Sequence, residues 1–197
     1  MDHYQRIAEH FQGSIESAAM GVDHIAEPLA LAADLIAASL VADHKVMVCG
    51  IGPDAAIGQL FVSHMQSPPE RERPALPCFS LSADGASLSA LACAQGDVDL
   101  FGPQVRALGQ AGDTLICVNS ATTAEPLAGA LRAARERNLS LVIVSNADDN
   151  QSPGLAGDEA AVMLPSAARR GHLIELHAAL LNCLCHLVEN NLFGEEH

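Results

Sequence analysis

The pattern of apolar positions changes its period several times along the chain. Over the first 41 residues apolar side chains recur every three or four positions, which predicts two helices. From Lys45 onward, short β-rich runs alternate with stretches of helical spacing. The runs predicted to be strands are 45–49, 78–81, 113–118, 141–144 and 160–164. The helices predicted between and after them are 54–65, 85–93, 124–137 and 167–192.

This alternation decides the fold class. Short apolar strands separated by helices indicate a parallel sheet that is covered on both faces and joined by right-handed crossovers. We therefore predict an α/β fold, a three-layer αβα sandwich with a five-stranded parallel sheet and an N-terminal helical hairpin. Residues 1–197 are expected to form a single domain.

The predicted helices carry more apolar surface than one small domain can bury. The segment LIELHAALLNCLCHLV (173–188) is apolar nearly all round, and the N-terminal helices are rich in Ala and Leu. Association between copies of the chain is therefore expected, with residues 1–43 at the interface.

Composition narrows the class of partner. The 197 residues include 24 Asp and Glu against ten Lys and Arg, which gives a formal net charge of −14. Nucleic acid and anionic membranes repel such a balance, whereas a protein partner or a small ligand stays possible. No apolar run is long enough for a transmembrane helix, and the polar N-terminus does not resemble a secretory signal. A cytoplasmic protein is expected.

Six cysteines occur without a CxxC pair, most of them inside apolar runs. They are interpreted as small buried hydrophobic residues of a reduced protein. The alternative is a metal site formed by Cys183, Cys185 and His186 on the terminal helix.

Two loops that follow predicted strands are candidates for ligand binding. Such loops meet at the carboxyl ends of parallel strands, and a Gly-rich or Ser/Thr-rich loop before a helix can present N–H groups to a phosphate. The alternative is that Asp54 and Thr123 are ordinary helix caps. The candidate ligand-binding residues are Gly50, Gly52, Asp54, Asn119, Ser120, Thr122 and Thr123.

Four segments carry a resemblance to a known family. They are VCGIGPDAAIGQLFVSHM (48–65), RERPALPCFSLSAD (71–84), QVRALGQAGDTLICVNS (104–120) and IELHAALLNCLCHLVENNLF (174–193). Over essentially its whole length the chain resembles the sugar isomerase (SIS) domain proteins of the phosphoheptose isomerase group, and within it the branch that associates with the replication initiator DnaA. The resemblance implies a homotetramer, or dimer of dimers, of αβα sandwiches.

The departures from that family concern chemistry. By the resemblance, Asp54 stands where a serine helps to hold the sugar phosphate, and two negative charges about 4 Å apart repel by about 4 kcal/mol in a partly dry pocket. The positions assigned to catalysis and metal binding hold Leu60, His64, Ile174 and Asn182. Leucine, isoleucine and asparagine cannot move a proton between carbon atoms.

Three side chains remain as candidates for acid–base chemistry. His64 is a possible base, with Glu175 and His177 to assist it, but the last two are two residues apart on a helix and point to different faces. His172 also replaces a family arginine, which weakens anion binding. No catalytic residue, metal or other cofactor is therefore expected.

An apolar pair near the C-terminus, Leu192 and Phe193, matches the pair with which the DnaA-associating branch contacts its partner. The pair is either a docking element or a cap on the protein's own core. Three functions follow: a non-catalytic homotetrameric scaffold that binds DnaA in replication initiation, a sedoheptulose 7-phosphate isomerase, or a sensor of a nucleotide sugar or an uncharged sugar derivative. A sugar phosphate or sugar derivative stays a possible small-molecule partner.

Overall fold

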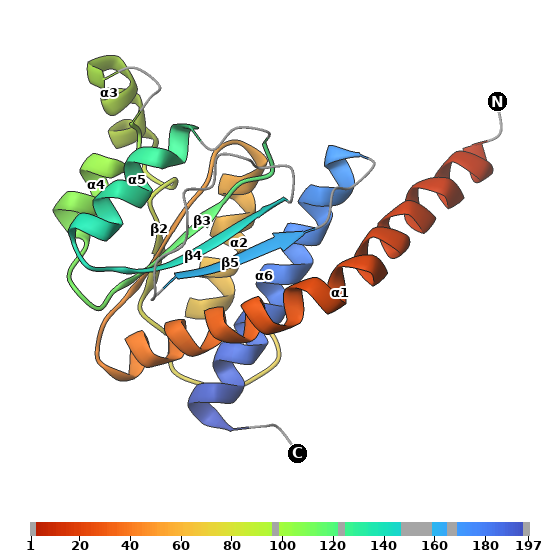
Figure 1. The fold of residues 1–197 in the computed structure, drawn as a ribbon, viewed down its shortest axis with the longest axis horizontal. Coiled ribbons are helices and arrows are strands. Elements are labelled where there is room, and N and C mark those ends of the chain that lie inside the picture. The colour runs from red at the N-terminus through yellow and green to blue at the C-terminus, as the bar shows by residue number, and fades with distance from the viewer. Residues whose placement is uncertain (1–2, 96–98, 122–124, 147–158, 165–168, 195–197) are drawn as a thin grey trace.

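A five-stranded parallel sheet forms the centre of the molecule (Figure 1). The computed structural model describes residues 3–95, 99–121, 125–146, 159–164 and 169–194. The strands are β1 (Val46–Cys49), β2 (Cys78–Ser80), β3 (Thr114–Val118), β4 (Ser140–Asn146) and β5 (Glu159–Leu164). Their order in the sheet is β2-β1-β3-β4-β5, and every neighbouring pair is parallel.

The strands are apolar because both of their faces are covered. In β1, Val46 and Val48 enter one core cluster, whereas Met47 and Cys49 enter the cluster on the opposite face. Successive side chains of a strand point to opposite faces, so a run without polar positions is what a doubly covered strand requires. All four of these side chains are at most 1% exposed.

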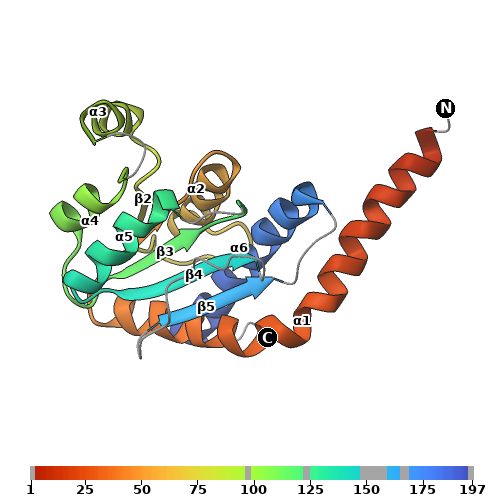
Figure 2. The same cartoon turned by 45° about the horizontal axis from the view of Figure 1, so that its top comes forward.

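Helices cover both faces of this sheet. They are α1 (His3–Val41), α2 (Pro53–Gln66), α3 (Gly85–Gln95), α4 (Gly102–Leu108), α5 (Glu125–Glu136) and α6 (Arg170–Phe193). One face is covered by α2, α6 and the second half of α1, and the other by α4 and α5 (Figures 1 and 2). The predicted α/β class, the αβα layers and the five-stranded parallel sheet are confirmed.

The prediction of an N-terminal helical hairpin is wrong. Residues His3–Val41 form one continuous helix of 39 residues. Pro28 lies inside it, and a proline removes one helical hydrogen bond and bends a helix without necessarily ending it. Figure 2 shows α1 changing direction, so that its second half packs on the sheet and its first half extends away from the body.

The sequence analysis also missed α4. This helix has only seven residues, which is too short for a helical period to stand out. Val105 is its buried anchor, and Pro103 occupies the first turn, where its missing N–H costs nothing. The predicted helix at 85–93 is confirmed as α3, and Asn138 takes the left-handed conformation (φ 57°) just after α5.

Two helices are long and apolar enough to cross a membrane by length and composition alone, namely Gly21–Val41 and Arg170–Phe193. Both pack against the sheet and against each other in one core cluster, which includes Ile36 and Leu184 at 0% exposure. A third of the first apolar window and half of the second are buried inside the molecule, so the core of the fold accounts for part of their apolarity.

Candidate functional site

The candidate ligand-binding loops meet where β1 and β3 end. The chain passes from β1 to β2 on one side of it and then returns to β3 on the other side, so the direction of the strand order reverses between β1 and β3. The crevice at such a reversal is where open α/β sheets bind ligands. Gly50–Asp54 follows β1, and Asn119–Ala121 is the described part of the loop that follows β3.

The first loop depends on its two glycines. A side chain at Gly50 would collide with the backbone of Asp54, because its Cβ would lie 2.7 Å from the Asp54 carbonyl carbon. Gly52 has φ +61°, a conformation that side-chain-bearing residues rarely adopt. Ser82 fixes the loop from β2 by donating its hydroxyl to the Gly50 carbonyl at 2.7 Å. Asp54 is thereby placed in the first turn of α2.

The Asp54 carboxylate occupies the space between the two loops. Its side chain is buried, and its Oδ2 accepts hydrogen bonds from the Ser120 backbone N–H (2.9 Å) and the Ser120 hydroxyl (3.0 Å). These donors, with the N-terminus of α2, are the kind of groups that bind an external anion. Here the protein's own carboxylate is the anion.

His177 of α6 approaches the same carboxylate from below the loops. Its ring is fully buried, Nδ1 lies 3.9 Å from Asp54 Oδ1, and Nε2 lies 3.4 Å from the Ser145 carbonyl oxygen. Neither Asp54 Oδ1 nor His177 Nδ1 has a hydrogen-bond partner in the described part of the chain. The two atoms face each other at a separation that is too long for a hydrogen bond.

The space left beside Asp54 is small. A cavity of about 100 Å³ is lined by the described residues Ile51, Asp54, Val118, Asn119, Ala121, Leu127 and Arg170. Ligand pockets usually have about 300–1,000 Å³. The described walls therefore leave room for a few waters or a small group rather than for a whole sugar phosphate.

The second loop is only partly described. Asn119 is buried, and its side-chain oxygen accepts the Ala121 backbone N–H at 3.2 Å, which closes a local turn. Thr122 and Thr123 lie outside the described residues, and the ligand role predicted for them stays a prediction. The same holds for most of the loop predicted at 146–154.

The three candidates for acid–base chemistry make separate contacts. Glu175 points to α1, where it accepts a hydrogen bond from the Ser14 hydroxyl and its Oε1 lies 3.1 Å from His10 Nε2. These contacts hold the Glu175 pKa below its usual range, and the Ser14 hydrogen bond is the largest cause. His177 points to Asp54 instead. His64 is half-buried on α2, and no described contact joins its ring to Glu175 or His177.

The positions that the family resemblance assigns to the isomerase metal do not fit a metal. Leu60 and Asn182 are exposed, and Ile174 packs against the core. Leucine and isoleucine carry no donor atom, and an asparagine amide is a poor ligand for zinc, which prefers Cys, His and carboxylate groups. His64, at the fourth of these positions, is a possible ligand, but it is in no candidate metal cluster of the described residues. We derive no chemistry through a metal at this place.

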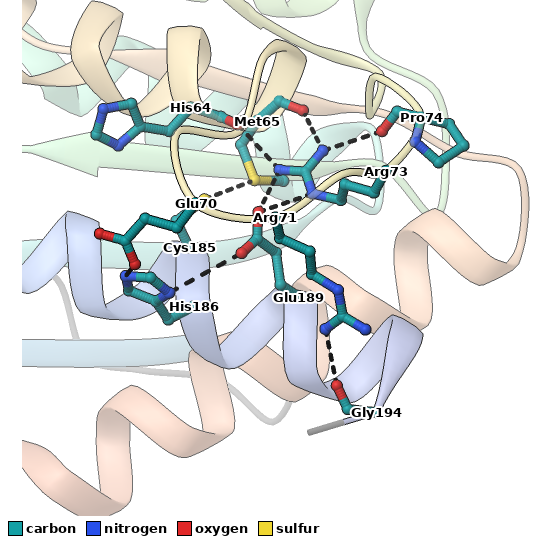
Figure 3. Close-up of polar contacts among 10 residues, drawn as sticks. All are labelled: His64, Met65, Glu70, Arg71, Arg73, Pro74, Cys185, His186, Glu189 and Gly194. Carbon is teal, nitrogen blue, oxygen red and sulfur yellow. Dashed lines mark hydrogen bonds and ion pairs between the residues drawn. The ribbon is translucent and has the colours of Figure 1, made fainter. Parts of the chain in front are cut away.

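The two residues of the C-terminal apolar pair have different environments. Leu192 packs against the core cluster, whereas Phe193 is 39% exposed. Arg71 holds the end of the helix by donating to the Gly194 carbonyl at 2.8 Å (Figure 3). It also donates to the Phe193 carbonyl at 2.9 Å, and its guanidinium lies over the Phe193 ring at 5.4 Å. Leu192 therefore caps the protein's own core, and Phe193 is the member available to a partner.

A buried ion pair anchors the segment that carries Arg71. Arg73 donates from Nε to Glu189 of α6 at 2.7 Å, and both side chains are at least 94% buried. The Arg73 guanidinium also donates to the His64 (2.9 Å) and Met65 (2.8 Å) carbonyls at the end of α2 (Figure 3). Arg73 thus joins the last turn of α2 to the last turns of α6.

Sequence reasoning missed both of these arginines. The signal available was the segment RER (71–73), which holds two of the ten basic residues of an acidic chain between a helix and a strand. Only the fold shows that the carbonyl groups ending α2 and α6 lie within reach of this segment.

The cysteine prediction holds for four residues and is wrong for two. Cys49, Cys78, Cys117 and Cys185 are buried, whereas Cys93 and Cys183 are exposed. Cys183 and Cys185 are two residues apart on α6, so their side chains point to different faces. Among the described residues, they do not converge with His186 on a metal site.

Comparisons with known proteins agree with this fold. A model of the SIS domain family matches residues 10–146. The chain is 35% identical to a phosphoheptose isomerase from Methylococcus capsulatus over 99% of this chain and 100% of the relative. It is 33% identical to the DnaA initiator-associating protein DiaA from Yersinia pestis over 98% of each chain. The structure of phosphoheptose isomerase GmhA from Neisseria gonorrhoeae superposes with a TM-score of 0.86 at 28% identity, covering 95% of this chain and 98% of that one.

Proposed function

This chain belongs to the SIS domain family, and we propose that it acts there as a non-catalytic, homotetrameric scaffold that binds DnaA in the cytoplasm during replication initiation. Relatives named as phosphoheptose isomerases and relatives named as DnaA-associating proteins match it about equally well. Overall similarity therefore does not choose between the two functions, and the choice rests on individual residues.

The observation that carries the proposal is the position of Asp54. Its carboxylate takes the two Ser120 donors that would otherwise be available to a phosphate, and it places a negative charge there. Aldose–ketose isomerisation also needs a base that moves a proton between adjacent carbons. Leu60, Ile174 and Asn182 stand where the family resemblance expects the groups that perform or assist this step.

Self-association is supported by the first half of α1. Its apolar side chains recur at helical spacing on one side of a helix that extends away from the body (Figure 1). They are more than half exposed in the single chain, namely Tyr4, Ile7, Phe11, Ile15 and Val22. A contiguous exposed apolar stripe of this kind usually packs against a partner. The same stripe on a second copy of the chain can pack against it, as in a symmetric interface between identical subunits. A Phe11→Glu variant is expected to run as a smaller species than the wild type in light scattering after gel filtration, and an unchanged mass would reject this interface.

The C-terminus supplies the partner contact in this proposal. Phe193 is exposed, and Arg71 fixes both its ring and its carbonyl group, so little side-chain freedom is lost when a partner binds. Exposed aromatic residues held rigidly are typical anchors of protein interfaces. A tetramer presents four copies, which adds avidity without any new contact.

The direct test is binding of purified DnaA to the immobilised protein. Wild-type protein is expected to retain DnaA, and Phe193→Ala is expected to retain at least tenfold less at equal loading. Leu108→Ala is the matched control, because Leu108 is a similarly exposed apolar side chain on α4. Absence of DnaA binding by the wild type, or equal binding by Phe193→Ala, would overturn the proposal.

A sugar-binding role is the second candidate, and the polar groups beside Asp54 favour it, although the described cavity of about 100 Å³ accommodates only a small part of such a ligand. Asp54 and Asn119 can hydrogen-bond hydroxyl groups there, and Arg170 contributes a positive charge at the rim. A ligand that binds only the folded protein raises its melting temperature, so a thermal-shift screen of sugars and sugar phosphates tests this role. Turnover of sedoheptulose 7-phosphate, measured with and without zinc, tests the isomerase alternative directly, and none is expected.

A further inference from the structure

A polar cluster between α1 and α6 is used neither by the ligand loops nor by the C-terminal pair. It contains His10 and Ser14 from α1 and His172 and Glu175 from α6. His10 Nε2 lies 3.1 Å from Glu175 Oε1, and His10 Nδ1 lies 3.3 Å from His172 Nε2. One potential ligand atom from each of His10, His172 and Glu175 falls within 4.8 Å of the other two.

We propose that His10, His172 and Glu175 form a binding site for a divalent transition-metal ion of the zinc type. Two imidazoles and one carboxylate are a ligand set that suits such ions. Ligand atoms around tetrahedral zinc, at about 2.0–2.1 Å from the ion, are separated by roughly 3.3 Å from each other. His10 offers a single nitrogen to an ion, so one of the two short separations (3.1 Å to Glu175 or 3.3 Å to His172) matches this value. The remaining separations are at most 4.8 Å and would shorten when an ion binds. This site is separate from the positions of Leu60, His64, Ile174 and Asn182.

The burial of the three side chains suits a site with an open coordination position. His172 is only 3% exposed, and its Nδ1 has no hydrogen-bond partner in the described part of the chain. His10 and Glu175 have side chains that are 42% and 47% exposed, so an ion and a water ligand can enter from that side.

Neighbouring residues shape this site. Ser14 donates its hydroxyl to the second oxygen of Glu175, which orients the carboxylate as partners behind metal ligands commonly do. Gly13 makes room for His172, because a Cβ at this position would lie 2.6 Å from His172 Cε1. A bound ion would join the projecting half of α1 to α6 and fix the direction of the helix that carries the exposed apolar stripe.

The experiment titrates tag-free, chelator-treated protein with Zn²⁺ by calorimetry and with Co²⁺ by visible absorption. The wild type is expected to bind one ion per chain, and His10→Ala and Glu175→Gln are expected to weaken binding at least tenfold. His24→Ala is the matched control, because it removes a histidine from the same helix outside the cluster. Circular dichroism confirms that each variant is folded.

Two outcomes would overturn this site. One is wild-type protein that binds no Zn²⁺ or Co²⁺ at micromolar concentration. The other is binding that His10→Ala and Glu175→Gln leave unchanged, which would place the ion elsewhere. A third measurement uses Mg²⁺, a hard ion that prefers oxygen ligands, and no competition with Co²⁺ is expected. None of these readouts depends on DnaA.

Discussion

Replacing Asp54 by serine tests whether this carboxylate keeps anions out of the loop. The substitution removes a buried charge that accepts two hydrogen bonds from Ser120 and leaves those two donors unoccupied. An anion bound there in the wild type would lie roughly 4 Å from the carboxylate, where two unit charges repel by about 4 kcal/mol at an effective dielectric constant near 20. Since 1.4 kcal/mol is a factor of ten in Kd, Asp54→Ser is expected to bind phosphate about three orders of magnitude more tightly.

The assay is calorimetry with inorganic phosphate and with sedoheptulose 7-phosphate at one fixed, low ionic strength, because salt screens such interactions. Asp84→Ser is the control, since Asp84 also accepts N–H groups at the start of a helix and its loss changes the net charge equally. Asp54→Asn separates charge from size, and it is expected to gain affinity as well.

The reasoning fails if folded Asp54→Ser binds phosphate no better than Asp84→Ser. It fails equally if the wild type already binds phosphate at micromolar concentration, because the carboxylate would then not exclude anions. Gain of binding without gain of turnover is the expected combination, since the variant restores only the anion site.

Two further predictions concern stability and thiol chemistry. Glu189→Gln leaves the buried Arg73 without its counter-charge, so the free energy of unfolding, measured in urea at equal protein concentration, should fall by about 3–5 kcal/mol. Glu136→Gln breaks an exposed pair, and its free energy of unfolding should fall by at most about 1 kcal/mol. Alkylation of native protein at pH 8 followed by mass spectrometry should label only Cys93 and Cys183. Burial raises the pKa of the Cys185 thiol to about 11 and also raises the pKa of Cys78, and the hydrogen bond to Cys117 raises the pKa of Cys49. Few of these buried thiols are therefore present as the reactive thiolate at pH 8. Rapid labelling of Cys185, or equal losses in the two glutamate variants, would contradict the burial on which these predictions depend.

The sheet could be predicted from the sequence because each of its strands is buried on both faces. Leu115 and Ile116, for example, are adjacent in β3, enter opposite core clusters and are both fully buried. Such a run can be read locally, without knowledge of its neighbours in space. The extent of α1 could not be read in this way. Gly13 lowers helix propensity, and only the His172 ring packed against it accounts for a glycine inside a continuous helix.

The sequence predicted individual residues of the candidate site but not the contacts between residues that are distant along the chain. The loop Gly50–Asp54 predicted an acidic residue at the start of a helix, which the structure confirms. The two-residue separation of Glu175 and His177 predicted that their side chains point to different faces of the helix, and they contact different partners. The Ser120 hydrogen bonds to Asp54 join residues that are 66 positions apart. No local pattern encodes such a contact, because it depends on how β1 and β3 pair.

The arrangement of these residues explains how the fold can be kept while its chemistry changes. Leu60 and Asn182 are exposed and Ile174 packs only at the margin of the core, so substitutions at these positions leave the packing on either face of the sheet intact. Asp54 differs, since a buried carboxylate is tolerated only with hydrogen-bond donors around it. Ser120 supplies two of them, and Asp54 lies in the first turn of α2, so features suited to binding a phosphate here stabilise the protein's own carboxylate. Under the proposed function, one substitution in one loop is therefore compatible with both the loss of a phosphate ligand and the retention of the fold.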